Sequence, residues 1–210
     1  MGGKPKKQNS AKPRDGAARP VRADAKRNMD TLLQTAMAVF ATSGVDAPVR
    51  EIAEQAGVGV GTVYRHFPQR SDLIAAVFRR EIDACADAAP VLAAKHAPFE
   101  ALANWMQRYA AFIATKRGLA PALHSGNPAF EPLRAHFDQR VRPALRTLLE
   151  SAAAAGQIRV DVDADDLLGA VASLCMSVHN DAAGQARRMV ALLVDGLRYG
   201  TKRSSPRSSR

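Results

Sequence analysis

The chain has 210 residues, of which 47% are apolar and only 5% aromatic. This length and apolar content are enough for a packed core, either in one large domain or in a small domain and a medium one. Its net charge is +10, but the excess lies at the ends: residues 1–22 hold seven Lys and Arg against one Asp, and residues 198–210 hold five with no acid. No apolar run reaches the roughly 18 residues that a transmembrane helix needs, and no apolar signal stretch follows the basic N-terminus. We therefore expect a cytoplasmic protein without a membrane partner, whose ends supply long-range attraction to nucleic acid.

The spacing of apolar residues predicts an all-α fold, because no alternating runs rich in Val, Ile and Thr occur. Residues 1–22 and 200–210 are rich in Lys, Arg, Pro, Ser and Gly and are expected to be disordered basic tails. Whether these tails contact DNA or serve only solubility is left open. The first helix is expected over residues 23–42, where Leu32 and Ala36 belong to an apolar stripe at three- and four-residue steps.

Two short helical runs joined by a glycine turn follow in residues 48–72, PVREIAEQAGVGVGTVYRHFPQRSD. Ile52 and Ala56 recur at helical spacing, Gly57 supplies a turn residue with positive φ, and a second helical run begins near Thr62. This is the layout of a helix-turn-helix, whose second helix enters the DNA major groove. A plain helical hairpin within an all-α protein has the same spacing, so spacing by itself does not decide between the two.

The residue types around the second helical run give information that the spacing does not. TVYRHF at 62–67, followed by PQRSDL at 68–73, closely resembles the tetracycline-repressor (TetR) family of bacterial transcription regulators, and the resemblance covers about residues 24–78. It implies an N-terminal helix-turn-helix DNA-binding domain at 23–70, a helical ligand-binding and dimerisation domain at 71–199, and about nine helices. It also implies a homodimer that binds a palindromic double-stranded DNA operator, most simply as a repressor, and responds to a small-molecule effector that the sequence does not identify.

The resemblance also assigns DNA contacts residue by residue. Tyr64 matches a position whose hydroxyl meets phosphates or bases in the family, and Arg70 matches a basic residue that clamps the DNA backbone. Arg50 matches a position that reaches a base edge, although an ion pair with Glu54 is the alternative. The family varies at Arg65, so solvent exposure of that side chain is left open. The full expected set is Lys26, Arg50, Val60, Gly61, Thr62, Tyr64, Arg65, His66 and Arg70.

Six further helices are expected beyond residue 70, with an interruption between Pro90 and Pro98. Their expected ranges are 71–89, 99–116, 119–124, 129–155, about 165–179 and 182–199. The last two have wide apolar faces, and in the family this pair meets its twin as a four-helix bundle, although part of each face must also be core. The expected dimer contacts are Leu167, Leu168, Val171, Val190, Leu193, Val194 and Leu197.

Aromatic, sulfur-containing and His side chains of the C-terminal region suit a cavity for an apolar effector with one or two hydrogen bonds. The expected lining is Trp105, Tyr109, Phe112, His124, Phe137, Cys175, Met176 and His179, with ordinary core packing as the alternative for each. No cofactor or metal is expected, because no two histidines form an i,i+4 pair or adjoin a cysteine. No catalytic constellation indicates an enzyme. A non-specific, ligand-independent DNA-associated helical protein is the alternative function.

Overall fold

Every element that the structure describes is helical. This computed structural model describes residues 18–123, 125–177 and 182–199. The all-α fold expected from the apolar spacing is confirmed within these ranges. Residues 1–17 of the tail expected at 1–22, and all of the tail expected at 200–210, lie outside the described residues, whereas residues 18–22 are helical and the expectation is wrong for them.

Eight α-helices and one short 3₁₀ helix make up the described chain. They are α1 (Ala18–Ser43), α2 (Val49–Gln55), α3 (Val60–His66), α4 (Arg70–Lys95), α5 (Pro98–Leu123), η1 (Pro128–Phe130), α6 (Glu131–Ala154), α7 (Ala164–Ser177) and α8 (Ala182–Gly196). The first helix begins at Ala18, before the expected start at residue 23. The segments expected as separate helices at 99–116 and 119–124 form one helix, α5.

α4 is also longer than the apolar pattern predicted. It runs straight through Pro90, where an interruption was expected, and ends at Lys95. Proline removes one backbone hydrogen-bond donor from a helix, but Cys85, Ala86 and Ala89 around it are buried, and α4 packs along both α5 and α6. Packing against these two neighbours therefore keeps the helix intact across the proline.

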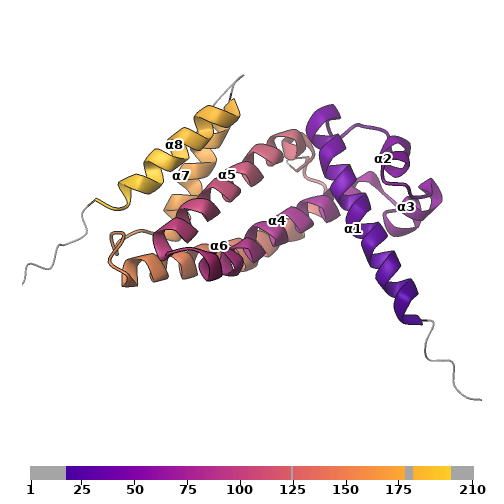
Figure 1. Cartoon of the computed structure of the whole chain (residues 1–210). Helices are drawn as coiled ribbons and strands as arrows, with labels where there is room; N and C mark the ends of the chain where they lie inside the picture. The colour runs from indigo at the N-terminus through magenta and orange to yellow at the C-terminus, as the bar shows by residue number, and fades with distance from the viewer. Residues whose placement is uncertain (1–17, 124, 178–181, 200–210) are drawn as a thin grey trace, which may run out of the picture.

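The helices form an elongated molecule whose two ends differ (Figure 1). α2 and α3 lie beside α1 at one end, and α7 and α8 lie at the other. α4, α5 and α6 run between these ends, and α4 contacts α1 as well as α5 and α6. α4 follows the helix-turn-helix in the chain and packs along α5, which contacts α1 at one end and α7 and α8 at the other. None of the helices in the described ranges is long and apolar enough to cross a membrane.

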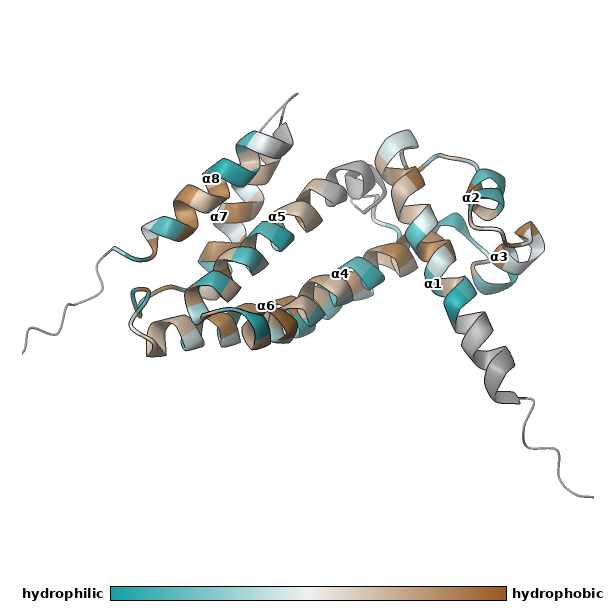
Figure 2. Cartoon of the chain, in the orientation of Figure 1, coloured by the Kyte–Doolittle hydropathy of each residue, from teal (hydrophilic) through white to brown (hydrophobic). Residues whose placement is uncertain are grey.

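One hydrophobic cluster extends through both ends of the molecule. It includes Leu32 of α1, Ile52 of α2 and Val63 of α3, and it continues through Leu73 of α4 to Trp105 of α5. Figure 2 shows hydrophobic residues recurring in bands along the helices, with hydrophilic residues between them, as amphipathic helices require. Because α4 contributes to the cluster along most of its length, a shift of α4 disturbs packing at both ends.

α7 starts at an acidic cap. The Asp163 carboxylate accepts hydrogen bonds from the backbone N–H of Asp165 at 2.8 Å and of Asp166 at 3.0 Å. These N–H groups have no partner within the helix, so the carboxylate satisfies them and opposes the positive end of the helix dipole. The bonds from Asp166 and Asp165 lower the pKa of the Asp163 carboxyl below its ordinary value.

We expect Asp163→Ala to lower the melting temperature at pH 7, where the carboxylate is charged. A carboxyl whose pKa is lowered by folding stabilises the protein above its unfolded-state pKa, and this contribution disappears as the pH falls through the folded value. The gap in melting temperature between wild type and Asp163→Ala, followed by circular dichroism, should therefore shrink below about pH 4. Asp163→Asn is the control, since its amide oxygen caps the helix without titrating. A gap that is constant with pH would contradict the prediction.

Candidate nucleic-acid interface and adjoining cavity

A left-handed glycine separates the two short helices, as predicted. Gly57 has φ of +67°, a conformation that other residues adopt only with strain. Its N–H donates to Glu54 O at 3.1 Å, and the N–H of Val58 donates to Ala53 O at 2.9 Å, which together end α2. α3 then starts two residues later at Val60. The turn therefore fixes the angle at which α3 leaves α2.

α3 has one buried side and one exposed side. Val63 is 1% exposed and holds the helix against the core, while Tyr64 is 51% exposed. Arg65 and His66 are exposed as well. Of the other expected contacts on this helix, Gly61 is exposed, whereas Val60 and Thr62 are half-buried, with Val60 packed against the core. The exposed residues give α3 a surface of hydrogen-bond donors suited to phosphates and base edges.

Arg50 on α2 is exposed, and no ion pair joins it to Glu54 within the described ranges. The ion pair considered as an alternative role for this side chain is therefore not formed, and the guanidinium is available to a ligand. Lys26, the remaining expected contact on α1, has its side chain outside the described part of the structure.

Arg70 has a role within the protein that the sequence did not indicate. Its Nη1 donates to the carbonyl oxygens of Val45 and, at 2.8 Å, of Ala47 in the loop between α1 and α2. The side chain is half-buried and is the first residue of α4. It thus ties the start of α4 to the loop that leads into the helix-turn-helix. The two partners lie 25 and 23 residues away, so no local pattern announces them.

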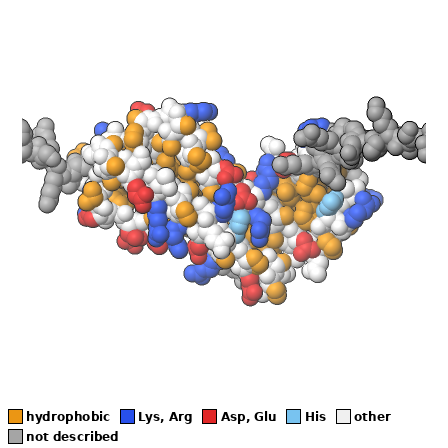
Figure 3. All heavy atoms as spheres, turned by 90° about the horizontal axis from the view of Figure 1, so that it is seen from below, with side chains coloured by type: hydrophobic (Ala, Val, Ile, Leu, Met, Phe, Trp, Pro, Cys, Tyr) orange, Lys and Arg blue, Asp and Glu red, His pale blue; other side chains and the backbone are white. Residues whose placement is uncertain are grey.

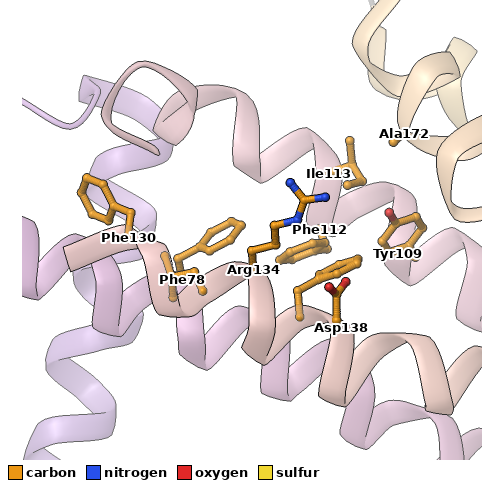
Figure 4. A pocket seen from close by; sticks show the side chains of 10 residues that line it. Phe78, Tyr109, Phe112, Ile113, Phe130, Arg134, Asp138 and Ala172 are labelled. Carbon is orange, nitrogen blue, oxygen red and sulfur yellow. The ribbon is translucent and has the colours of Figure 1, made fainter. Parts of the chain in front are cut away.

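A cavity of about 480 Å³ lies between α4, α5, α6 and α7 (Figure 4). Its size falls in the range of small-molecule sites. Its lining is mostly aromatic and aliphatic, with one basic and one acidic side chain, and consists of Phe78, Tyr109, Phe112, Ile113, Phe130, Leu133, Arg134, Phe137, Asp138 and Ala172. Burial raises the pKa of Tyr109, whose neutral hydroxyl donates to the Leu168 carbonyl at 3.5 Å.

The cavity contains only some of the residues expected there. Tyr109, Phe112 and Phe137 line it. Cys175 is buried but is not in the lining, and Met176 is 49% exposed on α7, facing away from the core. His124 and His179 lie outside the described residues. Neither Cys175 nor Met176 thus belongs to the lining of this cavity in the described structure.

Trp105 is a core residue and does not line the cavity. It is 0% exposed, its indole Nε1 donates to Cys85 O at 2.9 Å, and its ring stacks on Tyr109 with centroids 5.8 Å apart. The buried indole N–H thus has an acceptor on α4. The same burial raises the pKa of the Cys85 thiol to about 12, which keeps it protonated and unreactive.

Trp105→Phe should lower the free energy of unfolding by about 2–4 kcal/mol, because it leaves a void and removes the buried hydrogen bond from Nε1 to Cys85 O. Urea unfolding followed by circular dichroism measures this. Tyr64→Phe, which changes an exposed aromatic ring in the same chain, is the matched control and should leave the stability unchanged. A stability equal to that of wild type would mean that Trp105 does not hold α4 against α5.

Sequence reasoning missed both charged residues of the cavity and its contact with α4. Arg134 and Asp138 are one helical turn apart on α6, flanking Leu133 and Phe137 on the same face. Their position beside an apolar stripe could have indicated from the sequence that they line the cavity. Phe78 of α4 also lines the cavity, but only its packing partners, such as Phe112 with ring centroids 5.4 Å away, place it there.

Ion pairs join α4 to α6 below the cavity. The Asp83 carboxylate lies 2.8 Å from His136 Nε2 and 3.0 Å from Arg140 Nε, and Arg140 also reaches Asp87 at 2.5 Å. The surface in Figure 3 has acidic and basic side chains interspersed, not gathered by sign. The network thus fixes the register of α4 on α6 through matched charges on the surface.

Most of the apolar side chains expected at a dimer interface are buried within one protomer. Six of the seven expected residues are buried there and Leu193 is half-buried, the six being Leu167, Leu168, Val171, Val190, Val194 and Leu197. A side chain already buried has little surface left for a partner, so these six side chains belong mainly to the core of the protomer. Leu192 of α8, 76% exposed, and Met176 of α7 are the large apolar side chains that these two helices present outward.

Comparisons with known proteins agree along most of the chain. Residues 32–77 match the family described as bacterial regulatory proteins, tetR family, and residues 97–199 match the SbtR-like transcriptional regulator C-terminal domain. The chain is 38% identical to a TetR transcriptional regulator of Streptomyces coelicolor, covering 80% of this chain and 97% of that one, with a TM-score of 0.71. It is 37% identical to a TetR transcription regulatory protein of Mycobacterium vanbaalenii, covering 85% of this chain and 99% of that one, with a TM-score of 0.67.

The similarity to curated relatives is confined to a shorter segment. An HTH-type transcriptional regulator of Staphylococcus aureus is 39% identical over 64 residues, which is 30% of this chain. The match spans 35% of the length of that relative, so it concerns only part of each protein.

Proposed function

This chain belongs to the TetR family of DNA-binding transcription regulators, and from that premise we propose that it is a ligand-responsive repressor that binds a palindromic operator as a homodimer. Helices α1 to α3, about residues 23–70, would bind DNA, and the remainder to about residue 199 would bind the effector and the second protomer. The observation that supports this most is that one helix, α4, begins at the helix-turn-helix and lines the cavity.

α4 supplies the link between ligand and DNA. Arg70, its first residue, holds the loop before α2, and Phe78 lines the cavity eight residues later, about 12 Å along the helix axis. A ligand that packs against Phe78 therefore acts on a helix whose other end is bonded to the DNA-binding domain. Occupation of the cavity would favour an α4 position unsuited to the operator, which shifts the population towards free protein.

Two recognition helices are needed for specific binding, because one short helix contacts too few bases to select an operator. The outward face of α8 is the surface we assign to the dimer. Gly184, Arg188, Leu192 and Asp195 are exposed and follow one another at three- and four-residue steps on that face. Leu192 would be its apolar centre, which is where interface energy concentrates.

Selection of genomic fragments by the purified protein, followed by a footprint at stated salt, tests the proposal. A protected palindrome with half-sites about one helical turn apart is the expected result. Preference for it over random duplex should be roughly 10³-fold or more. Recovery of fragments without a shared motif would overturn the proposal and favour a non-specific DNA-binding protein.

Tyr64→Ala should weaken binding to the selected operator about tenfold or more, because it removes an exposed side chain of α3 that offers both a ring and a hydroxyl. Fluorescence anisotropy with operator and random duplexes at fixed salt measures this. The salt dependence should stay the same, since tyrosine carries no charge. Ala41→Gly, on an exposed site of α1, is a control. Wild-type affinity in a folded Tyr64→Ala protein would remove Tyr64 from the contact surface.

A further inference from the structure

Four aromatic side chains, Phe78, Tyr109, Phe112 and Phe137, line the cavity and pack against one another. Phe112 stacks on Phe137 with centroids 6.2 Å apart and an interplanar angle of 19°, and Tyr109 stacks on Phe112 at 6.1 Å and 27°. Phe78 adds a further ring 5.4 Å from Phe112. Aromatic rings gain from aromatic neighbours in offset-stacked or edge-to-face arrangements, so a lining with four rings favours an aromatic guest over an aliphatic one of the same size.

The two charged side chains of the cavity, Asp138 and Arg134, differ in whether they form an ion pair. Asp138 lies 3.3 Å from Arg142 one turn further along α6, so its charge is compensated. Arg134 makes no ion pair within the described ranges, although Asp138 is only four residues away. Figure 4 shows Arg134 extending from α6 towards Phe112 and Ile113, with Asp138 on the other side of the Phe112 ring in this view. The uncompensated charge of the lining is therefore a cation.

A guanidinium has a planar fork of N–H donors that matches the two oxygens of a carboxylate. Arg134 is exposed, which places it at the mouth of the cavity with its charge partly solvated. The lining contains this one basic side chain, so it provides for one carboxylate. These features together specify a guest with a ring at one end and a single carboxylate at the other.

We propose that the cavity binds an aromatic monocarboxylate, with the ring among Phe78, Tyr109, Phe112 and Phe137 and the carboxylate on Arg134. This inference rests on the proposed function, in which the cavity is the effector site. The ring of such a ligand contacts Phe78 and therefore α4, while its carboxylate selects it from neutral aromatics of the same size.

Isothermal titration of the full-length protein without DNA tests the ligand class. The probes are 4-biphenylacetate, its amide, and the fully saturated carboxylate of the same skeleton. Wild type should bind the aromatic acid about tenfold more tightly than the amide, because only the acid gains a charge-assisted bond to a partly solvated arginine. The saturated acid should also bind more weakly than the aromatic acid. In Arg134→Met, the acid and the amide should bind equally.

Arg146→Met, an exposed arginine of α6 outside the cavity lining, is the matched control and should keep the tenfold preference. Equal binding of acid and amide to wild type, or a preference that persists in Arg134→Met, would overturn the anion site. If the saturated acid bound as tightly as the aromatic acid, the preference for an aromatic ring would be overturned. If no probe bound, both the anion site and the aromatic site would be overturned. Because these titrations contain no DNA, a protected operator in the footprint would leave the regulatory function standing if they fail.

Discussion

Leu192→Glu is expected to convert the dimer into monomers and to weaken operator binding more than 100-fold. A charge at the centre of an apolar contact between two copies is unpaired and repels its twin. A monomer has only one recognition helix, so it loses the increase in affinity that comes from binding both half-sites at once, which is typically about 10²–10⁴-fold. Because Leu192 is 76% exposed in the protomer, the substitution leaves the protomer core intact.

The mass in solution, from size exclusion coupled to light scattering at micromolar concentration, measures the first effect, and anisotropy with the operator measures the second. Val160→Glu is the matched control: Val160 is 85% exposed, lies between α6 and α7, and should tolerate the charge without either effect. A monomeric mass for wild type, or a dimeric mass for Leu192→Glu, would rule out this interface.

Arg70→Ala should reduce both the stability of the helix-turn-helix and its affinity for every DNA sequence. Loss of the two bonds from Nη1 frees the carbonyls of Val45 and Ala47, which should cost about 1–2 kcal/mol for a half-buried guanidinium. The guanidinium has further N–H donors for a phosphate, so the slope of affinity against salt should also fall by about one.

Arg70→Lys separates the two roles of this side chain. Lysine keeps the charge and should restore the salt slope, but its ammonium lies one bond closer to the backbone than Nη1 and reaches the two carbonyls less well, so the melting temperature should recover only in part. Thermal unfolding by circular dichroism and anisotropy at several salt concentrations measure the two effects. An unchanged melting temperature in Arg70→Ala would show that the bonds to the loop do not stabilise the domain.

Local features of the chain were predictable because they depend on neighbours in sequence. The turn at Gly57, the burial of Val63 and the exposure of Tyr64 follow from backbone conformation and from the helical repeat. The cap at Asp163 is equally local. Helix boundaries were less predictable: Pro90 breaks no helix, since contacts with α5 and α6 outweigh the loss of one hydrogen bond.

The sequence by itself determined the helical class, the helix-turn-helix and the family, because apolar spacing and a short motif encode them. Only the tertiary structure decided which apolar faces close on the protomer and which stay exposed, as Val194 and Leu192 illustrate two residues apart. It also brought Arg70 to the loop before α2 and set Arg134 opposite Phe112. These pairings join residues more than 20 positions apart, and their geometry depends on how whole helices pack, which no local pattern contains.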